Sequence, residues 1–268
     1  MSAKSQHNPY MMEPVEIIDI IQETDIEYTF RLASDIEPNF GQFLEVSIPG
    51  YGEAPISVSD FGDGWLDLTI RRVGRLTDRI HELKVGDKLF VRGPYGNGFP
   101  VDEYRDKHLV IAAGGTGLAP VRSIINYLES NPEQVKKLDL LMGFKNPESM
   151  LFERDIKKWE QKFNLILTVD QADANWDHNE GLITEYVNDI ELDNKENLEI
   201  VVVGPPVMMK FTTQEFIKHD IPEDKLWVSY ERKMHCGIGK CGHCKIEDTY
   251  ICLEGPVFNY TEAKNLQD

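Results

Sequence analysis

Short runs in which hydrophobic and polar residues alternate fill the first hundred positions of the chain. They cover residues 15–20, 26–32, 42–48, 54–59, 65–71 and 88–92, and turn-forming residues separate them. Asp63-Gly64, between two of the runs, predicts a hairpin turn. Short strands at this spacing predict an antiparallel β-barrel over residues 13–102, interrupted by one helix over residues 77–83 that Thr77 caps. Residues 1–12 precede the pattern, and we expect a disordered leader there.

The pattern changes after Pro100, where apolar runs without polar alternation begin to alternate with helical periods. Unbroken apolar runs are typical of strands that are buried on both faces of a parallel sheet. The predicted strands are residues 108–113, 137–143, 164–169, 199–204 and 226–230, and the predicted helices are residues 118–129, 149–161, 183–189 and 207–218. This order predicts a doubly wound α/β domain over residues 103–230, followed by a small segment over residues 231–268.

Composition and charge narrow the class of protein. The chain has 268 residues, of which 41% are hydrophobic, and its formal net charge is −18, which argues against a nucleic-acid partner. No apolar run reaches the length of a transmembrane helix, and no signal peptide is apparent. We therefore expect a cytoplasmic protein with no membrane partner, and a protein partner with a basic docking surface.

The cysteines of the chain lie close together near its end. Cys236, Cys241, Cys244 and Cys252 follow the pattern C-x4-C-x2-C, then seven residues, then C. This is the spacing of plant-type [2Fe-2S] clusters. Three glycines among them would let the loop fold tightly, with N–H groups pointing at the sulfur atoms of the cluster. A hairpin over residues 245–251 would return Cys252 to the site.

Two other uses of these cysteines stay open at this point. A structural zinc site is one, although it more often shows two C-x2-C pairs or regularly spaced histidines. A pair of disulfides is the other, and it would need an oxidising compartment. His235 and His243 lie beside the cysteines, and we expect them to support the site or to face solvent rather than to be ligands.

Three stretches of the predicted barrel have the chemistry to hold a flavin nucleotide. They are residues 54–57, residues 70–77 and the glycine-rich turn at residues 93–98. The start of the predicted helix suits a pyrophosphate, and the arginines supply positive charge. The expected flavin-binding residues are Pro55, Ile56, Ser57, Val58, Ile70, Arg71, Arg72, Gly74, Arg75, Leu76 and Thr77. The alternative is an ordinary barrel with exposed arginines and turn glycines.

The predicted α/β domain carries a candidate pyridine-nucleotide site. Gly115, Thr116 and Gly117 lie between a buried strand and a helix, where glycines allow close approach of a phosphate. Gly204 and Pro205 end the fourth strand at the same carboxyl edge of the sheet. Asp170 ends the third strand, where a carboxylate would accept hydrogen bonds from a ribose diol and repel a 2′-phosphate. We therefore predict NADH rather than NADPH, unless Asp170 is only a loop or capping residue.

Taken together, these features resemble the ferredoxin–NADP reductase superfamily. More narrowly, they resemble the electron-transfer subunits of dihydroorotate dehydrogenase and the B subunits of anaerobic sulfite reductase. The resemblance runs from about residue 13 to the end of the chain. The strings that carry it are Gly52-Glu-Ala-Pro-Ile-Ser-Val-Ser-Asp60, Gly62-Asp-Gly-Trp65, Pro94-Tyr-Gly-Asn-Gly98, Val203-Gly-Pro-Pro206, Tyr230-Glu-Arg232, Gly239-Lys-Cys-Gly-His-Cys244 and Gly255-Pro-Val-Phe-Asn-Tyr260.

The resemblance implies an NADH-dependent oxidoreductase that passes electrons from NADH through FAD and a [2Fe-2S] cluster to partner proteins. In anaerobic sulfite reductase, the partners would be the iron–sulfur protein of the complex and its sirohaem-containing catalytic protein, which reduces sulfite to sulfide. No side chain need act as acid or base, so no catalytic residue is assigned. The superfamily's flavin motif carries an arginine and a tyrosine where this chain has Ala54 and Ile56, so one of the barrel arginines must compensate.

Two alternative functions follow from the same residues. One is the flavin and iron–sulfur subunit of a sulfur-linked NiFe hydrogenase, which shares the tail Gly255-Pro-Val-Phe-Asn259, or of a dihydroorotate dehydrogenase complex, which Ala54 disfavours. The other belongs to a different class, a zinc-stabilised regulatory subunit without catalysis, and it predicts a colourless protein that contains zinc and no flavin.

Overall fold

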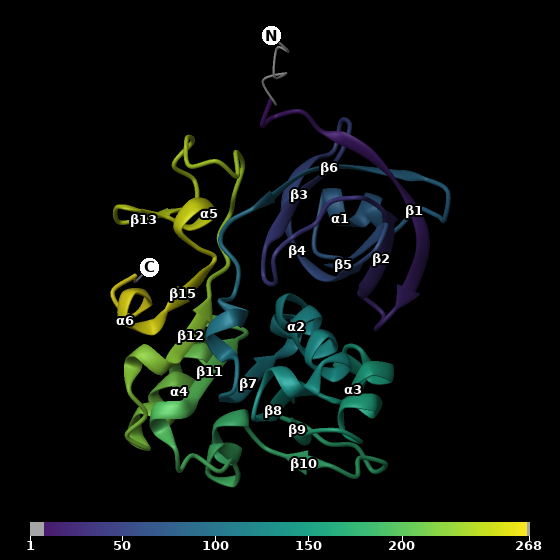
Figure 1. Ribbon diagram of the computed structural model, residues 1–268. Coiled ribbons are helices and arrows are strands. Elements are labelled where there is room, and N and C mark those ends of the chain that lie inside the picture. Colours follow the sequence, from purple (N-terminus) through teal and green to yellow (C-terminus); the bar gives the residue numbers. More distant parts are fainter. Residues whose placement is uncertain (1–7, 267–268) are drawn as a thin grey trace.

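The first part of the chain forms a closed antiparallel barrel. The computed structural model describes residues 8–266. The barrel strands are β1 (Glu13–Gln22), β2 (Glu27–Ala33), β3 (Phe43–Ile48), β4 (Gly52–Gly62), β5 (Trp65–Arg71) and β6 (Lys88–Tyr95). They run in the order β1-β2-β5-β4-β3-β6, and β6 pairs with β1 to close the barrel (Figure 1). Alternate residues such as Ile17, Leu44 and Leu68 fill the interior, which confirms the predicted barrel.

The helix of the barrel begins earlier than its predicted start. Helix α1 spans Arg75–Ile80, and its N-cap is Gly74 in an extended conformation with φ 168°. Thr77 is therefore inside the first turn, and the expectation that it is the N-cap was wrong. Its hydroxyl instead accepts hydrogen bonds from the backbone N–H groups of Val73, at 2.9 Å, and of Gly74, at 3.1 Å. Thr77 stabilises the loop that enters the helix rather than the helix itself.

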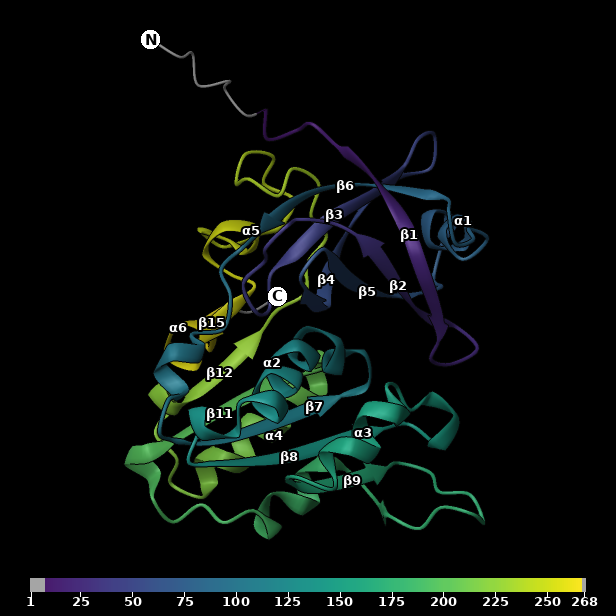
Figure 2. The ribbon, with the colours of Figure 1, turned by 45° about the vertical axis from the view of Figure 1, so that its right-hand side comes forward.

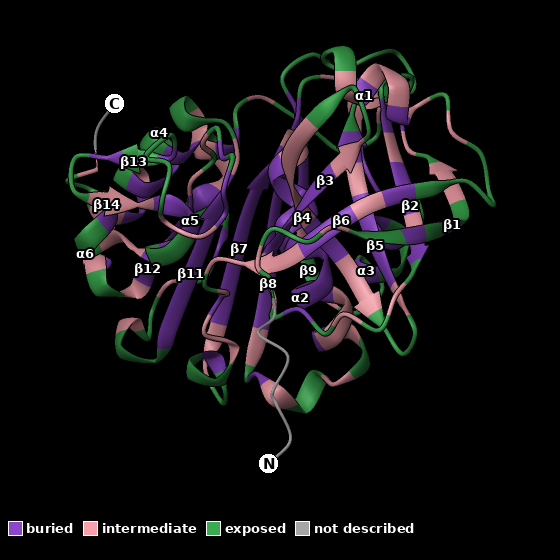
Figure 3. Cartoon of the chain, turned by 90° about the horizontal axis from the view of Figure 1, so that it is seen from above, coloured by how far each residue is buried: buried purple, intermediate pink, exposed green. Residues whose placement is uncertain are grey.

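The second part is a seven-stranded sheet. Its strands are β7 (His108–Gly114), β8 (Lys137–Phe144), β9 (Asn164–Val169), β10 (Asn179–Glu180), β11 (Leu198–Val203), β12 (Leu226–Ser229) and β15 (Val257–Asn259). They run in the order β10-β9-β8-β7-β11-β12-β15, and every pair is parallel except β12 with β15. The central strands are buried along most of their length (Figure 3), and alternate residues of β7 belong to two different hydrophobic clusters. The predicted parallel sheet is confirmed.

Helices cover both faces of this sheet, as a doubly wound fold requires. Leu109 and Ile111 of β7 pack with α2 (Ala119–Ser130) and α3 (Glu153–Trp159), whereas Val110 and Ala112 pack with α4 (Pro206–Lys218).

The helix predicted over residues 149–161 is shorter, because Asn146-Pro147 starts a separate 3₁₀ turn. The helix predicted over residues 183–189 is a 3₁₀ helix. The 3₁₀ helices are η1 (Val101–Tyr104), η2 (Gly115–Leu118), η3 (Pro132–Gln134), η4 (Pro147–Ser149), η5 (Ile183–Asp189), η6 (Lys195–Asn197) and η7 (Glu223–Lys225).

The C-terminal segment packs against both larger parts. It holds the hairpin of β13 (Lys245–Ile246) and β14 (Thr249–Tyr250), then α5 (Ile251–Glu254), β15 and α6 (Tyr260–Ala263). The hairpin was predicted, but the addition of β15 to the sheet was not. Asn97, just after the barrel, donates from its side chain to the carbonyls of Glu254 and Val257, at 2.7 and 2.9 Å. The segment is thereby fixed to both the barrel and the sheet.

The start of the described chain also lies against the barrel. Residues 1–7 of the predicted leader lie outside the described residues, but residues 8–12 are described, and the carbonyl of Pro9 accepts a hydrogen bond from the Tyr95 hydroxyl at 2.8 Å. None of the helices in residues 8–266 is long and apolar enough to span a membrane.

Candidate functional site

A cavity lies between the barrel and the carboxyl edge of the parallel sheet. Its volume is about 410 Å³, and residues from both parts line it. The predicted flavin residues that line it are Pro55, Ile56, Ser57, Arg71 and Thr77, and the predicted nucleotide residues that line it are Thr116 and Gly204. Figure 2 shows the barrel above the ends of β7 and β12, with α2 between them. The fold thus brings together two sets of residues that were predicted independently.

Sequence reasoning missed part of the cavity wall. The missed residues are the last residue of β12, Ser229, and the residues after it, Tyr230, Glu231, Arg232 and Met234, all of which line the cavity. Because β12 lies beside β11 in the sheet, its carboxyl end comes next to Gly204. The rule that ligands bind at the carboxyl ends of parallel strands would have pointed to these residues. Glu27 and Phe43 of the barrel also line the cavity, and no motif marked them.

The other predicted flavin residues do not line the cavity. Val58 and Ile70 are buried in the barrel interior. Arg72 is exposed and pairs with Asp78 at 2.9 Å, and Arg75 donates to the carbonyl of Gly50 at 3.1 Å. Gly74 and Leu76 lie at the start of α1 beside Thr77. Of the three predicted flavin-binding arginines, only Arg71 lines the cavity, and it contacts Glu27 at 3.3 Å.

The glycines of the nucleotide loop serve a packing role that the sequence did not reveal. A Cβ on Gly117 would lie 2.5 Å from the Cα of Gly204 and 2.5 Å from the carbonyl oxygen of Val203. The 3₁₀ helix η2 and the end of β11 therefore meet backbone to backbone. Gly115 has φ +53° and open space around it. A glycine is favoured there by the backbone conformation and not by a close contact. Pro205 is the N-cap of α4.

Asp170 lies directly after β9 and is exposed. Its backbone N–H donates to the carbonyl of Phe144 at 2.9 Å, which fixes the turn after the strand. It is not among the residues that line the cavity. The preference for NADH over NADPH that Asp170 suggested stays a prediction.

The four cysteines gather at one place: Cys236, Cys241 and Cys244 lie in one loop, and Cys252 lies in α5. Cys236, Cys244 and Cys252 are buried, and Cys241 is exposed. Backbone N–H groups point at two of the sulfur atoms: Ile238, Lys240 and Cys241 donate to Cys236 Sγ at 3.5, 3.3 and 3.5 Å, and Gly239 donates to Cys252 Sγ at 3.2 Å. Gly237, Gly239 and Gly242 have φ of +70°, +67° and +79°, which lets the loop turn in this way.

The thiols form two neighbouring pairs. Cys241 lies beside Cys236, and Cys252 lies beside Cys244. Within residues 8–266, no three His, Cys, Asp or Glu side chains are arranged to hold a single metal ion. Two thiol pairs, surrounded by N–H donors, fit a two-iron cluster with two thiolates on each iron.

The protonation of the thiols follows their surroundings. A hydrogen bond from the His243 backbone lowers the pKa of Cys241, whereas burial raises the pKa of Cys252 to about 12. Since metal ligands must be deprotonated, the exposed Cys241 loses its proton to bind iron more easily than the buried Cys252 does.

Arg92 of β6 holds the beginning of the cysteine loop against the barrel. Its buried guanidinium donates to the carbonyls of Cys236, at 2.6 Å, and His235, at 2.7 Å, and it also pairs with Glu53. Glu45, opposite Arg92 on β3, is fully buried, and neither of its carboxyl oxygens has a hydrogen-bond partner among the described residues. Burial, with Glu53 nearby, raises the pKa of Glu45 to about 7. The loop is thus attached to β6, and through Glu53 to β4, whose residues wall the cavity.

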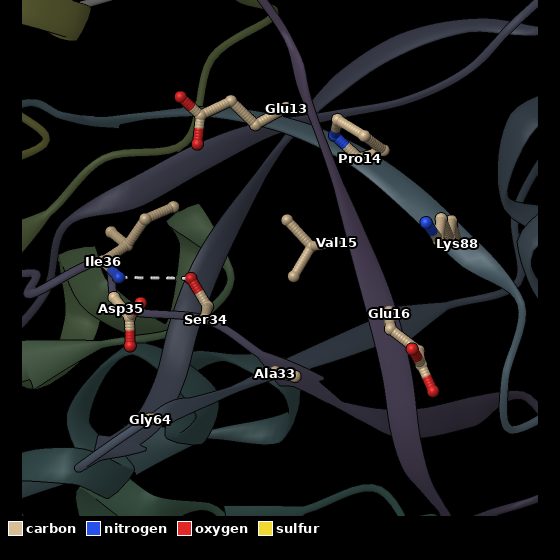
Figure 4. Close-up of a pocket in the computed structure, with 10 residues that line it drawn as sticks. All are labelled: Glu13, Pro14, Val15, Glu16, Ala33, Ser34, Asp35, Ile36, Gly64 and Lys88. Carbon is tan, nitrogen blue, oxygen red and sulfur yellow. Dashed lines mark hydrogen bonds between the residues drawn. The ribbon is translucent and has the colours of Figure 1, made fainter.

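A second hollow, of about 580 Å³, lies on the outside of the barrel (Figure 4). It is lined by Glu13, Pro14, Val15, Glu16, Ala33, Ser34, Asp35, Ile36, Gly64 and Lys88. The hydrogen bond drawn there runs from the backbone N–H of Ile36 to the Ser34 hydroxyl at 3.2 Å. None of the predicted site residues lines it, so the smaller cavity is the candidate site.

Two domain families match parts of the chain. Residues 111–214 match the oxidoreductase NAD-binding domain, and residues 231–264 match the iron–sulfur cluster binding domain of dihydroorotate dehydrogenase B. The first match covers the nucleotide loop and the end of β11, and the second covers all four cysteines.

Similar proteins extend over nearly the whole chain. Sulfhydrogenase 1 subunit gamma of Pyrococcus furiosus is 34% identical, over 94% of this chain and 92% of the relative, and sulfhydrogenase 2 subunit gamma of the same organism is 36% identical, over 96% and 97%. A Methanocaldococcus jannaschii protein named "Probable dihydroorotate dehydrogenase B (NAD(+)), electron transfer subunit" is 34% identical, over 92% and 90%.

Solved structures show the same fold. A chain from the structure of the NADH-dependent reduced ferredoxin–NADP oxidoreductase superposes with a TM-score of 0.76 at 23% identity, covering 96% of this chain and 94% of that one. This likeness shows the fold, and the two domain matches bear out the predicted pyridine-nucleotide and iron–sulfur sites.

Proposed function

Because the chain belongs to the family of iron–sulfur electron-transfer subunits that includes sulfhydrogenase gamma and dihydroorotate dehydrogenase B subunits, we propose that it carries electrons between NADH and a catalytic partner subunit. One observation carries the proposal. Predicted flavin residues of the barrel and predicted nucleotide residues of the sheet line the same cavity, and Met234 of that wall lies two residues before Cys236. The three cofactors would therefore lie in sequence along one path.

In this scheme, the residues of the chain bind and orient the flavin and the dinucleotide. Pro55, Ile56 and Ser57 form the barrel wall against which a flavin ring would lie, and Arg71 and Thr77 are placed to bind its phosphates. Thr116 and Gly204 offer backbone groups to the dinucleotide at the carboxyl edge of the sheet. FAD supplies the conversion of a two-electron hydride into one-electron steps.

The loop residues hold the iron. Cys236, Cys241, Cys244 and Cys252 would be the thiolate ligands, and the N–H groups of Ile238, Gly239, Lys240 and Cys241 stabilise the negative charge of the sulfur atoms. Arg92 keeps the loop against the barrel strands. No side chain of the site is assigned as acid or base.

The names and the coverage of the relatives support a partner of the hydrogenase or dihydroorotate dehydrogenase type. Ala54, in place of the arginine of the usual flavin motif, weighs against the dihydroorotate type. We therefore propose an NADH-linked gamma-type subunit of a hydrogenase complex as the first assignment.

A second candidate rests on a separate observation. The strings Glu53-Ala-Pro-Ile-Ser57 and Gly239-Lys-Cys-Gly-His-Cys244 resemble the B subunit of anaerobic sulfite reductase. In that assignment, the partners would be the iron–sulfur protein and the sirohaem protein of that complex. Both assignments share the electron path within this chain and differ only in the acceptor.

The electron path is tested by the absorption spectrum of anaerobically purified protein, before and after NADH. We expect flavin bands and a red-brown iron–sulfur shoulder that NADH bleaches. A colourless protein that contains zinc would overturn the proposal in favour of the regulatory class. Flavin bands that respond to NADPH and not to NADH would overturn the choice of nucleotide.

The partner is tested by purifying the complex through a tag on this chain. The purified complex is then assayed for NADH oxidation coupled to proton reduction, and separately coupled to sulfite reduction. Hydrogen evolution with a copurifying NiFe protein would support the first assignment. Sulfide production with a copurifying sirohaem protein would support the second.

A further inference from the structure

The stretch that carries the first three cysteines has a charge opposite in sign to that of the whole molecule. The chain has a formal net charge of −18, yet residues 232–245 contain four basic side chains, two histidines and no acid. A local patch of this kind orients a charged partner even when the whole molecule repels it, because screening limits interactions to about 8–10 Å at physiological salt. The sign of the local patch therefore decides what can approach the loop.

The loop is also where the thiol site reaches the surface. Cys241 is exposed, as are its neighbours Lys240 and His243. Leu253 of α5 is 54% exposed and lies under Gly239, since a Cβ there would be 2.1 Å from Leu253 Cδ1. The loop lies at the edge of the molecule, beside β6 and away from the helices of the sheet (Figures 1 and 2).

Two cations of the patch are available to a partner. Lys245 pairs with Asp248 at 2.9 Å, but Lys233 and Lys240 are exposed and have no ion-pair partner among the described residues. The Lys240 ammonium lies 6.0 Å from the centre of the Tyr10 ring, which is itself 48% exposed. The nearby acid Glu254 accepts a hydrogen bond from the backbone of Tyr250, at 2.5 Å. The exposed rim is therefore cationic on the side of Lys233 and Lys240, beside an apolar and thiol centre. The exposed acids Glu247, Asp248 and Glu254 lie on the other side, in the β13–β14 hairpin and α5.

We propose that this face, formed by Lys233, Lys240, Cys241, His243 and Leu253, docks the acidic rim around the one-electron centre of a partner protein. The proposal rests on the proposed function and reverses the expectation, drawn from net charge alone, of a basic partner. One electron leaves the iron–sulfur site and reduces the partner's centre at each encounter, without transfer of atoms. Each NADH, which gives up two electrons and one proton to become NAD⁺, supplies two such encounters.

The test uses the full cofactor-loaded protein and two protein acceptors of opposite charge. NADH-dependent reduction of rubredoxin, which is acidic, and of cytochrome c, which is basic, is followed over a range of NaCl concentrations. Both rates are compared with the NADH–ferricyanide rate of the same sample. The variants are Lys240→Glu, Lys240→Gln and Lys233→Glu. The matched control is Lys136→Glu, an exposed lysine before β8 that belongs to no ion pair in the described residues.

We expect rubredoxin reduction, relative to ferricyanide, to fall about three- to tenfold in Lys240→Glu and less in Lys240→Gln. Cytochrome c reduction should not fall, and Lys136→Glu should change neither rate. A redox titration of the cluster in each variant separates docking from a change in potential. Rubredoxin rates that are unchanged by the loop variants, or lowered equally by Lys136→Glu, would overturn the docking proposal. A wild-type protein that does not reduce ferricyanide with NADH would instead overturn the proposed function.

Discussion

Among single residues, Cys241 differs from the other cysteines because only its thiol is exposed. A serine there keeps the size of the side chain but is a much weaker ligand for iron. We predict that Cys241→Ser retains NADH reduction of the flavin, because none of the cavity residues changes. Transfer to a one-electron protein acceptor should fall by about tenfold or more. Stopped-flow absorbance and the EPR signal of the reduced cluster measure the two steps.

The neighbouring substitution His243→Gln is the control for Cys241→Ser, because His243 is exposed in the same loop and is not an expected ligand. It should leave both the flavin step and the cluster signal intact. Full transfer to the acceptor in Cys241→Ser would contradict the assignment of this thiol to the cluster.

The buried carboxyl group of Glu45 makes the stability of the protein depend on pH. Its pKa is raised from 4.5 to about 7, first by burial and then by Glu53 and Cys236, against an opposing effect of Arg92. The folded chain therefore holds a proton between these pH values that the unfolded chain releases. We predict that the free energy of unfolding of the cofactor-free protein falls by up to about 3 kcal/mol from pH 4.5 to pH 7.

Glu45→Gln should remove this part of the pH dependence and make the protein more stable than wild type at pH 8. Denaturant unfolding at a series of pH values measures the effect. Glu16→Gln, an exposed site on β1, is the matched control. Identical pH profiles for wild type and Glu45→Gln would refute the prediction.

At the scale of elements, the contact between η2 and the end of β11 determines the geometry of the nucleotide loop. A methyl group on Gly117 would collide with the backbone of Val203 and Gly204, which cannot rotate away as a side chain would. We predict that Gly117→Ala destabilises the fold by about 1–3 kcal/mol and weakens NADH binding. Thermal unfolding and titration of flavin reduction with NADH measure the two effects.

The control for Gly117→Ala is Gly74→Ala, because Gly74 is extended and a Cβ there meets nothing within 4 Å. Gly74→Ala should keep both stability and NADH affinity. Wild-type NADH affinity in Gly117→Ala would show that the close contact has no bearing on the nucleotide site.

Strands and helices could be predicted where the local pattern of hydrophobic residues alone determines the secondary structure. Unbroken apolar runs such as residues 108–113 and 199–204 identified β7 and β11, because both faces of these strands are buried. Thr77 was wrongly predicted as the N-cap of the helix. Its hydroxyl accepts hydrogen bonds from the preceding N–H groups of Val73 and Gly74, and the sequence alone does not reveal this. Strand β15 was missed because it is only three residues long and pairs with β12, some thirty residues earlier in the sequence.

At the scale of the whole molecule, only part of the residues that line the candidate site could be predicted from the sequence. Motifs identified residues near 55, 116 and 204, and the fold brings them to one cavity. The contribution of residues 229–234 depends on which strand lies beside β11, and that is a property of sheet order rather than of a motif. Arg92, which joins β6 to the cysteine loop across 144 residues of sequence, likewise left no local signal.

The relative position of the barrel and the sheet depends on a buried ion-pair network. Arg122 of α2 donates to Asp155 of α3 at 2.8 Å and to Asp67 of β5 at 3.1 Å, and its guanidinium lies 4.5 Å from the centre of the Phe152 ring. Removing one partner of a buried pair is costly because the other charges stay buried. We predict that Arg122→Met costs about 3 kcal/mol of stability, measured by denaturant unfolding.

The same variant should slow flavin reduction by NADH, since the flavin wall belongs to the barrel and the nucleotide loop to the sheet, and small displacements between reacting groups cost about a hundredfold in rate. The cluster signal should not change, because the loop is held by Arg92 rather than Arg122. Arg154→Met, an exposed arginine on α3, is the matched control. An Arg122→Met protein that loses stability but reduces its flavin at the wild-type rate would show that the network stabilises the fold without setting the distance between flavin and nucleotide.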